Sequence, residues 1–536
     1  MSIDDPKPKN IILCFDGTQN QFGPLPRTNV LKLYQLFTNN STQRCYYQPG
    51  VGVKFHSESY QILSRKSKIF NMLTKWDAAI GYSLGCHVRA AYLYLMKHFK
   101  QGDRIFLFGF SRGAFTARVL AGMVESVGLL QEGLEEMVAY AYEIYCNWEY
   151  SGQPSQKDST LTLTEEFRET FSRRIEIQLM GLWDSINSVG LGFRDQTFPY
   201  TARSRIVRHV RHAVSIDERR VKHKPVLFDE CLDGNDLIFQ GTSNSDSRNY
   251  LGIPSFTVPD SARNLPTISD DVIEKWFPGN HGDVGGGWPS DPSGHNLSDL
   301  SLLWMLSEVM EYKLKFNPGS LNLFHAQHSS IDCLMSYHHD ILSYSKRKNP
   351  VYQQDELSET SPLLRPDDRE RRCGVESYNA NVRNGEITIR FDSHSSASYE
   401  QDTASDSIHY GAFTEIEPRS PVLRFDARGD ESFFSTTFWY FLELLPFSNK
   451  IQDSKGLWLR SYKPNLGQRR VIPNQASFHW SVFYMMHYVE DYKPTNLPDN
   501  FNDKFIESLP YELQSLDEIQ KESIWLKIPD DLGTYL

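Results

Sequence analysis

Residues 104–118 read RIFLFGFSRGAFTAR, and this stretch decides the fold. The apolar run from Arg104 to Phe108 is typical of a buried strand. A helical pattern rich in small residues follows from Ala114 to Leu130. The turn between them, Gly109–Gly113, has the pattern G-x-S-x-G. Strand, sharp turn and helix in this order are the context of a nucleophile elbow, so Ser111 is predicted to be a nucleophile.

The residues around Ser111 fit the demands of such an elbow. The turn forces the nucleophile into a strained backbone conformation, and its neighbours must therefore be small; Gly109 and Gly113 meet this need. Because the helix begins directly after the turn, the backbone N–H of Arg112 is placed to donate to a developing oxyanion.

Similar apolar runs on both sides of this segment predict a parallel sheet. A helical pattern from about Trp76 to Phe99 precedes it. Strand, crossover helix and strand in this order imply an α/β fold, here an α/β-hydrolase-like, mostly parallel sheet with helices on both faces. The further predicted strands are Ile11–Phe15, Arg44–Gln48, Glu176–Trp183 and Val272–Phe277.

Two polar residues after predicted strands complete a candidate catalytic triad. Asp184 follows Trp183, and His281 lies in the Gly-rich stretch WFPGNHGDVGGGW, which suits a tight loop presenting an imidazole. The order Ser, Asp, His is the order of this fold class. Alternatives are that Asp184 is a helix N-cap, that His281 is structural, or that His212 is the base. Near His212, a charged network of Asp217, Glu218 and Arg220 is interpreted as structural.

The turn after the first strand offers a second oxyanion donor. Gly17 permits close approach of the backbone, and the amide of Gly17 or Thr18 is the candidate donor. Haloacid-dehalogenase-like phosphatases also begin with D-x-D-G-T after a first strand. Here the leading position is Cys14, so their aspartyl nucleophile is absent and that class is disfavoured.

A second G-x-S-x-G pentapeptide occurs at Gly81–Gly85. No apolar strand precedes it, because the residues before it read TKWDA. We therefore interpret it as a loop or helix start that matches by chance, and Ser83 is not expected to be a nucleophile.

Composition indicates an intracellular protein. The seven cysteines include no C-x-x-C pair, and the first residues lack the charge and apolar run of a signal peptide. The net charge of -11 argues against a nucleic-acid partner. The expected location is cytoplasmic, with peripheral contact to membranes, and the expected chemistry needs no metal and no cofactor. The oligomeric state is left open.

The chain is expected to contain a polar insertion. The stretch 345–419 is rich in Ser, Asp, Glu and Arg and poor in apolar residues, which predicts disorder. It divides a hydrolase domain at 9–340 from a helical, aromatic-rich region at 420–536 that would complete the fold.

Several motifs together resemble one known family, the type VI secretion phospholipase effectors and their fungal relatives. The resemblance spans residues 9–315, and it implies a Ser-Asp-His triad at Ser111, Asp184 and His281 and ester chemistry on lipids. The motifs are FDGTQN, TNVLKLY, GFSRGAFTAR, GLWDSINSVG, HAVSIDERR and WFPGNHGDVGGGW, with LGQRRVIP and FHWSV resembling the fungal branch.

We therefore expect a serine hydrolase acting on the carboxylic esters of lipids or phospholipids; the alternative is a non-catalytic scaffold of the same fold. The basic and apolar stretch 60–76 is a candidate membrane contact, with an apolar face at Ile62, Ile69, Leu73 and Trp76. Packing of this helix on the core is the other interpretation.

Overall fold

The computed structural model gives the arrangement of most residues between 8 and 344 and of part of the chain that follows. It describes residues 8–18, 26–50, 70–147, 161–187, 198–201, 204–228, 271–328 and 330–344. In the C-terminal part it describes 380–383, 386–389, 423–424, 427–430, 433–445, 449–452, 458–461, 463–474, 476–490, 492–498 and 501.

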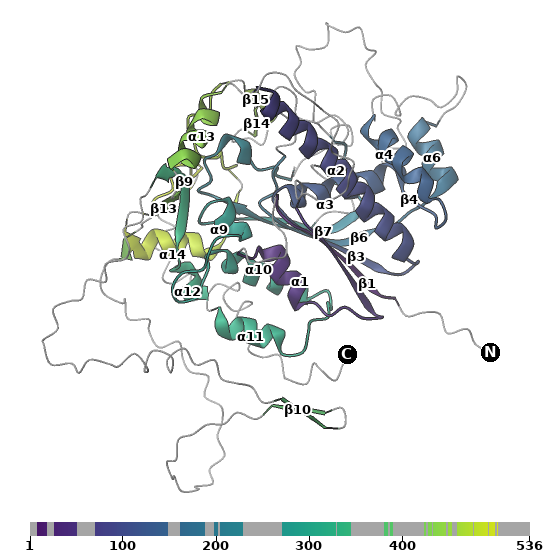
Figure 1. The fold of residues 1–536 in the computed structure, drawn as a ribbon, viewed down its shortest axis with the longest axis horizontal. Helices are drawn as coiled ribbons and strands as arrows, with labels where there is room; N and C mark the ends of the chain where they lie inside the picture. The colour runs from purple at the N-terminus through teal and green to yellow at the C-terminus, as the bar shows by residue number, and fades with distance from the viewer. Residues whose placement is uncertain are drawn as a thin grey trace, which may run out of the picture. The chain divides into compact units, whose positions relative to one another are not determined.

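A seven-stranded sheet with the order β16-β8-β7-β6-β3-β1-β2 carries the fold. Four of its strands, β7, β6, β3 and β1, are labelled in Figure 1. Every neighbouring pair in it is parallel. The α/β fold class predicted from the sequence is confirmed. The strands are β1 (Asn10–Phe15), β2 (Gln43–Gln48), β3 (Arg104–Phe110), β6 (Ile177–Trp183), β7 (Val207–Ser215), β8 (Asp271–Phe277) and β16 (Ser477–Phe478).

Helices cover both faces of this sheet, which explains why its central strands are apolar throughout. In β1, Ile11 and Leu13 pack into one hydrophobic cluster and Ile12 and Cys14 into the other. The first cluster is completed by α2 (Phe70–His98), α3 (Arg112–Val127), α4 (Val138–Cys146) and α6 (Leu163–Phe171). The second is completed by α1 (Asn29–Leu36), α10 (Ser298–Met310) and α11 (Ser320–Gln327).

One interpretation made from the sequence needs correction, and one strand was missed. The second pentapeptide, Gly81–Gly85, is neither a loop nor a helix start, because it lies well inside α2. The helix absorbs its two glycines without a turn. The strand β7 was not predicted. Its sequence, RHVRHAVS in residues 208–215, carries charged residues at positions that the fold nevertheless buries, such as Arg211.

The C-terminal part contributes to the same fold. β16 pairs with β8 and forms one edge of the main sheet. Among the described residues of this part are the helices α13 (Phe433–Leu444) and α14 (Trp480–Tyr488), so the expected helices are present, beside several short strands. Smaller paired strands here are β9 (His338–Tyr344) with β13 (Ala427–Asp430), β12 (Leu423–Arg424) with β17 (Val489–Glu490), and β14 (Asn449–Gln452) with β15 (Trp458–Ser461).

The remaining short elements connect the larger ones. They are β4 (Leu129–Leu130), β5 (Ser172–Arg173), the 3-10 turns η2 (Glu135–Met137) and η3 (Val221–His223), and the helices α9 (His281–Gly285) and α12 (Ser330–Leu334). Among the described residues no helix is both long and apolar enough to cross a bilayer.

By its contacts the chain divides into two units, 1–346 with 422–536, and 347–421. The part of the second unit that the structure describes is the antiparallel hairpin of β10 (Ala380–Arg383) and β11 (Glu386–Ile389). Most of the predicted insertion at 345–419 lies outside the described residues, so its disorder and the proposed domain boundaries stay predictions.

Candidate active site

Three of the predicted site residues meet at the carboxyl edge of the sheet. Ser111 follows β3 directly, Asp184 follows β6 and His281 lies a few residues beyond β8. Because parallel strands end at the same edge, residues far apart in the sequence are brought together there. All three side chains are buried, with 4%, 0% and 7% of their residue surfaces exposed.

The three side chains form a continuous chain of contacts. Nε2 of His281 lies 2.8 Å from Oγ of Ser111. Nδ1 of the same ring lies 2.5 Å from Oδ2 of Asp184. One imidazole therefore bridges a hydroxyl and a carboxylate, the arrangement that can pass a proton away from the serine.

The backbone at Ser111 has the geometry of a sharp elbow. Its φ of 60° and ψ of -127° lie in a region that non-glycine residues rarely occupy, and α3 begins at the next residue. The glycines around it are required by space. A Cβ on Gly113 would lie 2.3 Å from the carbonyl oxygens of both Phe15 and Asp16. A Cβ on Gly109 would lie 2.6 Å from Cα of Ala114.

His281 is not presented by a loop, as its glycine-rich surroundings had suggested, but is the first residue of the helix α9. The reason is the capping box before it. The Asn280 side chain accepts from the amides of Gly282 and Asp283, and the Asp283 carboxylate accepts from the amide of Asn280. The ring of Phe110 packs on the imidazole with centroids 4.7 Å apart. The capping box therefore fixes the backbone of His281, and Phe110 supports its ring.

Asp184 is held by a dense set of donors. The backbone amide of Ser215 donates to Oδ1 at 3.0 Å, and the Ser215 hydroxyl lies 3.2 Å from Oδ2. The guanidinium of Arg470 donates to both oxygens, Nη1 to Oδ1 at 2.6 Å and Nη2 to Oδ2 at 2.8 Å. The alternative of a helix N-cap is wrong, because Ser185–Asn187 are not helical.

Arg470 is the site residue that sequence reasoning missed. The motif LGQRRVIP had been noted, but only as part of a resemblance. The single available signal was a pair of arginines next to an apolar run, and nothing in it distinguished Arg470 from Arg469. In the structure Arg470 is buried, whereas Arg469 has a side chain that is 28% exposed.

The environment favours the deprotonated form of both the acid and the base. Burial acts to raise the pKa of Asp184, but the Arg470 charge and the hydrogen bond from His281 outweigh it and hold that pKa well below its usual range. Burial also lowers the pKa of His281, against the opposing influence of Asp184. An ionised carboxylate beside a neutral imidazole is the state that a general base needs.

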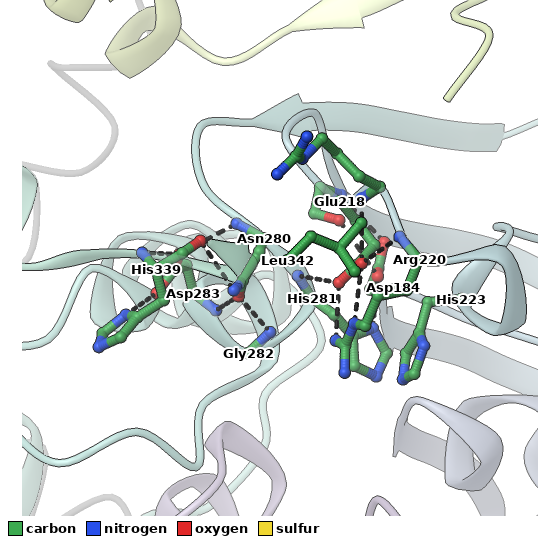
Figure 2. A network of polar contacts seen from close by, with 12 residues as sticks. Asp184, Glu218, Arg220, His223, Asn280, His281, Gly282, Asp283, His339 and Leu342 are labelled. Atoms are coloured by element: carbon green, nitrogen blue, oxygen red, sulfur yellow. Dashed lines mark hydrogen bonds and ion pairs between the residues drawn. The ribbon is translucent and has the colours of Figure 1, made fainter. Parts of the chain in front are cut away.

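A second ion pair flanks the imidazole (Figure 2). The Glu218 carboxylate pairs with Arg220 at 2.7 Å and accepts from the backbone amide of His281 at 3.3 Å. The His223 ring packs against His281 with centroids 4.8 Å apart. The structural network predicted around these residues is therefore present, although Asp217 pairs separately with Arg469.

His212 does not serve as the base in this geometry. It lies in β7 with no exposed surface. Its Nδ1 lies 2.6 Å from Oε1 of Glu274, and its Nε2 accepts from the amide of Ser185 at 3.0 Å. Both ring nitrogens are thus used to support the turn that follows Asp184.

The predicted oxyanion donors divide into two groups. The Gly17 amide donates to the Asp16 carboxylate at 2.7 Å, so this N–H is already used and the expectation for Gly17 is not supported. Thr18 lies near the elbow, because Nη1 of Arg112 donates to its hydroxyl at 2.5 Å. Arg112 opens α3, which places its amide at the helix N-terminus beside Ser111.

Asp16 itself is a structural anchor. Its carboxylate is 2% exposed and also accepts from the hydroxyls of Thr28 at 2.7 Å and Tyr47 at 2.5 Å. Burial raises its pKa. A carboxylate saturated in this way holds the turn after β1 and is not presented as a nucleophile. Among the described residues no three His, Cys, Asp or Glu side chains are grouped as a metal ion requires.

Comparison with known proteins agrees with the motif resemblance. The family model for the catalytic domain of Tle1-like phospholipase effectors of the type VI secretion system matches residues 9–308. The uncharacterized protein YEL023C of Saccharomyces cerevisiae is 36% identical over 95% of this chain and 83% of its own length.

Two solved structures are more distantly similar. An uncharacterized protein from Pseudomonas aeruginosa matches 58% of this chain and 47% of its own, with 17% identity and a TM-score of 0.31. The Tle1 effector bound to the VgrG spike matches 54% of this chain and 52% of its own, with 14% identity and a TM-score of 0.27. The matches thus span about half the length of each of these chains.

Proposed function

The chain belongs to the family of Tle1-like phospholipase effector catalytic domains, and from this premise we propose that it is a serine hydrolase that cleaves carboxylic esters of lipids. The observation that carries the proposal is the contact chain from Ser111 through His281 to Asp184. The family supports a lipid ester as the substrate, and the geometry supports Ser111, His281 and Asp184 as the reacting groups.

The reaction would begin at the ester carbonyl. Oγ of Ser111 attacks the carbonyl carbon while Nε2 of His281 accepts its proton. The ionised Asp184 stabilises the imidazolium and keeps Nδ1 protonated. The imidazolium then gives its proton to the leaving alcohol, and a water molecule activated by the same imidazole releases the acyl group from Ser111.

The oxyanion of this reaction needs backbone donors. We assign one to the amide of Arg112, because it lies at the N-terminus of α3 directly after the nucleophile. The amide of Thr18 is the second candidate, since the Thr18 hydroxyl already contacts the Arg112 side chain. The Gly17 amide is not assigned as an oxyanion donor, because it already donates to the Asp16 carboxylate.

The decisive experiment is labelling with a fluorophosphonate probe, followed by hydrolysis of a panel of p-nitrophenyl and phospholipid esters. Ser111→Ala should abolish labelling and lower turnover by about 10⁴-fold or more. Ser83→Ala, from the second pentapeptide, is the matched control and should leave both largely intact. Absence of labelling in the parent protein would support a non-catalytic scaffold instead.

We further propose that the lipid is met at a membrane surface, with 60–76 as the contact. Residues 60–69 lie outside the described residues, and 70–76 begin α2, so this segment stays a prediction. Changing Arg65, Lys66 and Lys68 to Glu should abolish sedimentation with anionic vesicles and spare hydrolysis of a short ester. Sedimentation that persists after charge reversal would remove this segment as the contact.

A further inference from the structure

Arg470 reaches the catalytic acid from a part of the chain that the matched catalytic domain does not include. The match ends at residue 308, whereas Arg470 lies in the loop between β15 and β16. We propose that Arg470 is a positioning residue of the active site, and that the C-terminal loop must dock for the triad to work. This inference rests on the proposed function of Ser111, His281 and Asp184.

The contact between Arg470 and Asp184 is a paired, two-point one. Nη1 bonds Oδ1 at 2.6 Å and Nη2 bonds Oδ2 at 2.8 Å, so both carboxylate oxygens have a fixed partner. A planar guanidinium matches a carboxylate in this way, and a lysine ammonium cannot. The plane of the carboxylate is thereby set, and with it the direction in which Oδ2 faces Nδ1 of His281.

The same guanidinium also fixes the segments on either side of the acid. Nη1 donates to the hydroxyl of Ser215 at 2.7 Å and to its carbonyl at 3.0 Å, and Nη2 donates to the carbonyl of His223. Ser215 itself donates to Asp184, and the His223 ring packs on His281. The Arg470 side chain therefore contacts Asp184, Ser215 and the backbone of His223.

Burial makes this contact consequential. The side chains of Asp184 and Arg470 are 0% and 1% exposed. A carboxylate in this position without a cation would carry an uncompensated buried charge, which proteins avoid by protonation or rearrangement. Either response would weaken the hydrogen bond that orients His281. The ionised and oriented form of Asp184 thus depends on Arg470.

The loop that carries Arg470 is itself anchored to the core by a buried acid. Glu443 of α13 accepts from the side chain of Asn465 at 2.5 Å, from the amide of Gly467 at 3.0 Å and from the amide of Val221 at 2.6 Å. The Asn496 side chain donates to the carbonyl of Arg470 at 3.0 Å. These contacts hold the loop in place in addition to the contact between Arg470 and Asp184.

The charges around His281 indicate a measurable consequence. The charged and titratable groups that face it are Asp184, Glu218, Arg220 and His223, with the cations of Arg470 and Arg112 behind them; Asp283, on the same helix, is turned toward Asn280 and His339. Removing the Arg470 cation would raise the pKa of Asp184, and a protonated Asp184 cannot stabilise the imidazolium of His281. The acid limb of the pH–rate profile should then move to higher pH.

The test compares Arg470→Met, Arg470→Lys and the neighbouring Arg469→Met, with folding checked by near-UV circular dichroism. Hydrolysis of a short p-nitrophenyl ester is followed across pH. We expect Arg470→Met to lower kcat/KM by about 10²-fold and to raise the acid limb, since displacement of reacting groups by about 1 Å costs that much. Arg469→Met should change neither quantity, because Arg469 pairs with Asp217 instead.

Arg470→Lys keeps the charge and loses the two-point contact, and it is the variant that decides the matter if Arg470→Met fails to fold. Its acid limb should stay near that of the parent while kcat/KM falls by about tenfold. A folded Arg470→Met with the parent profile, or an Arg470→Lys with the parent kcat/KM, would overturn the proposal. Ser111→Ala in the same assay separates the two claims. Hydrolysis that survives this change contradicts the proposed function, whereas its loss together with a parent-like Arg470→Met contradicts only the role of Arg470.

Discussion

Gly113→Ala should disable the enzyme while leaving it folded. The added Cβ would lie 2.3 Å from the carbonyl oxygens of Phe15 and Asp16, which are backbone atoms at the end of β1. An unstrained contact needs roughly 3.5 Å, so the elbow or the end of β1 must shift by about 1 Å. That shift separates Ser111 from the turn at Thr18. We expect kcat/KM to fall by about 10²-fold and stability by about 1–3 kcal/mol.

The matched control for this substitution is Gly85→Ala, at the same position of the second pentapeptide. Its Cβ would approach the Tyr142 ring at 3.1 Å, with no backbone atom among its nearest neighbours. Inside α2, alanine favours the helix over glycine by about 1 kcal/mol. Hydrolysis of p-nitrophenyl butyrate and the thermal midpoint measure both variants. Equal kcat/KM for Gly113→Ala and Gly85→Ala would refute the assignment of the elbow to Ser111.

Three further predictions concern the base, its rival and the insertion. Because burial lowers the pKa of His281, the imidazole stays neutral below the usual histidine value of about 6.5, and kcat/KM should fall only as pH drops further; an acid limb above that value would contradict this. His212→Ala leaves the Ser185 amide and the Glu274 carboxylate without their ring partner, so a urea melt should show a loss of about 1–3 kcal/mol with turnover within about tenfold of the parent. His281→Ala in the same assay should instead cost about 10⁴-fold in turnover. Replacing 345–419 by a short Gly/Ser linker should move the thermal midpoint by only a few degrees, and insoluble protein would show that this segment packs on the rest.

The apolar strands and the elbow could be predicted from the sequence because local patterns determine them. β1 and β3 are apolar on both faces, and the glycines at 109 and 113 mark the turn between a strand and a helix. β7 was not predicted, because Arg211 interrupts its pattern. The fold buries that arginine against Asp271 and Glu308, and such compensation is visible only in three dimensions.

The active site could be predicted in part from the sequence. Strand ends and chain order brought out Asp184 and His281, since both follow apolar runs. Whether Gly17 offers a free amide depends on the rotamer of Asp16, which no pattern reveals. Arg470 could not be predicted, because its partner Asp184 is 286 residues away and its neighbour Arg469 has the same chemistry.

The position of Arg470 has a consequence for how the protein is made. A ribosome adds about 5–20 residues per second, so the 286 residues between Asp184 and Arg470 take roughly 15–60 seconds to synthesise. N-terminal parts fold first, and the nascent chain can build β1, β3 and β6 during this time. We expect it to hold an unaligned triad until the last part of the chain emerges. Chains stalled on the ribosome before residue 470 should therefore fail to react with a fluorophosphonate, whereas released full-length chains should react; labelling of stalled chains would show that the nascent enzyme is already active while it is being translated.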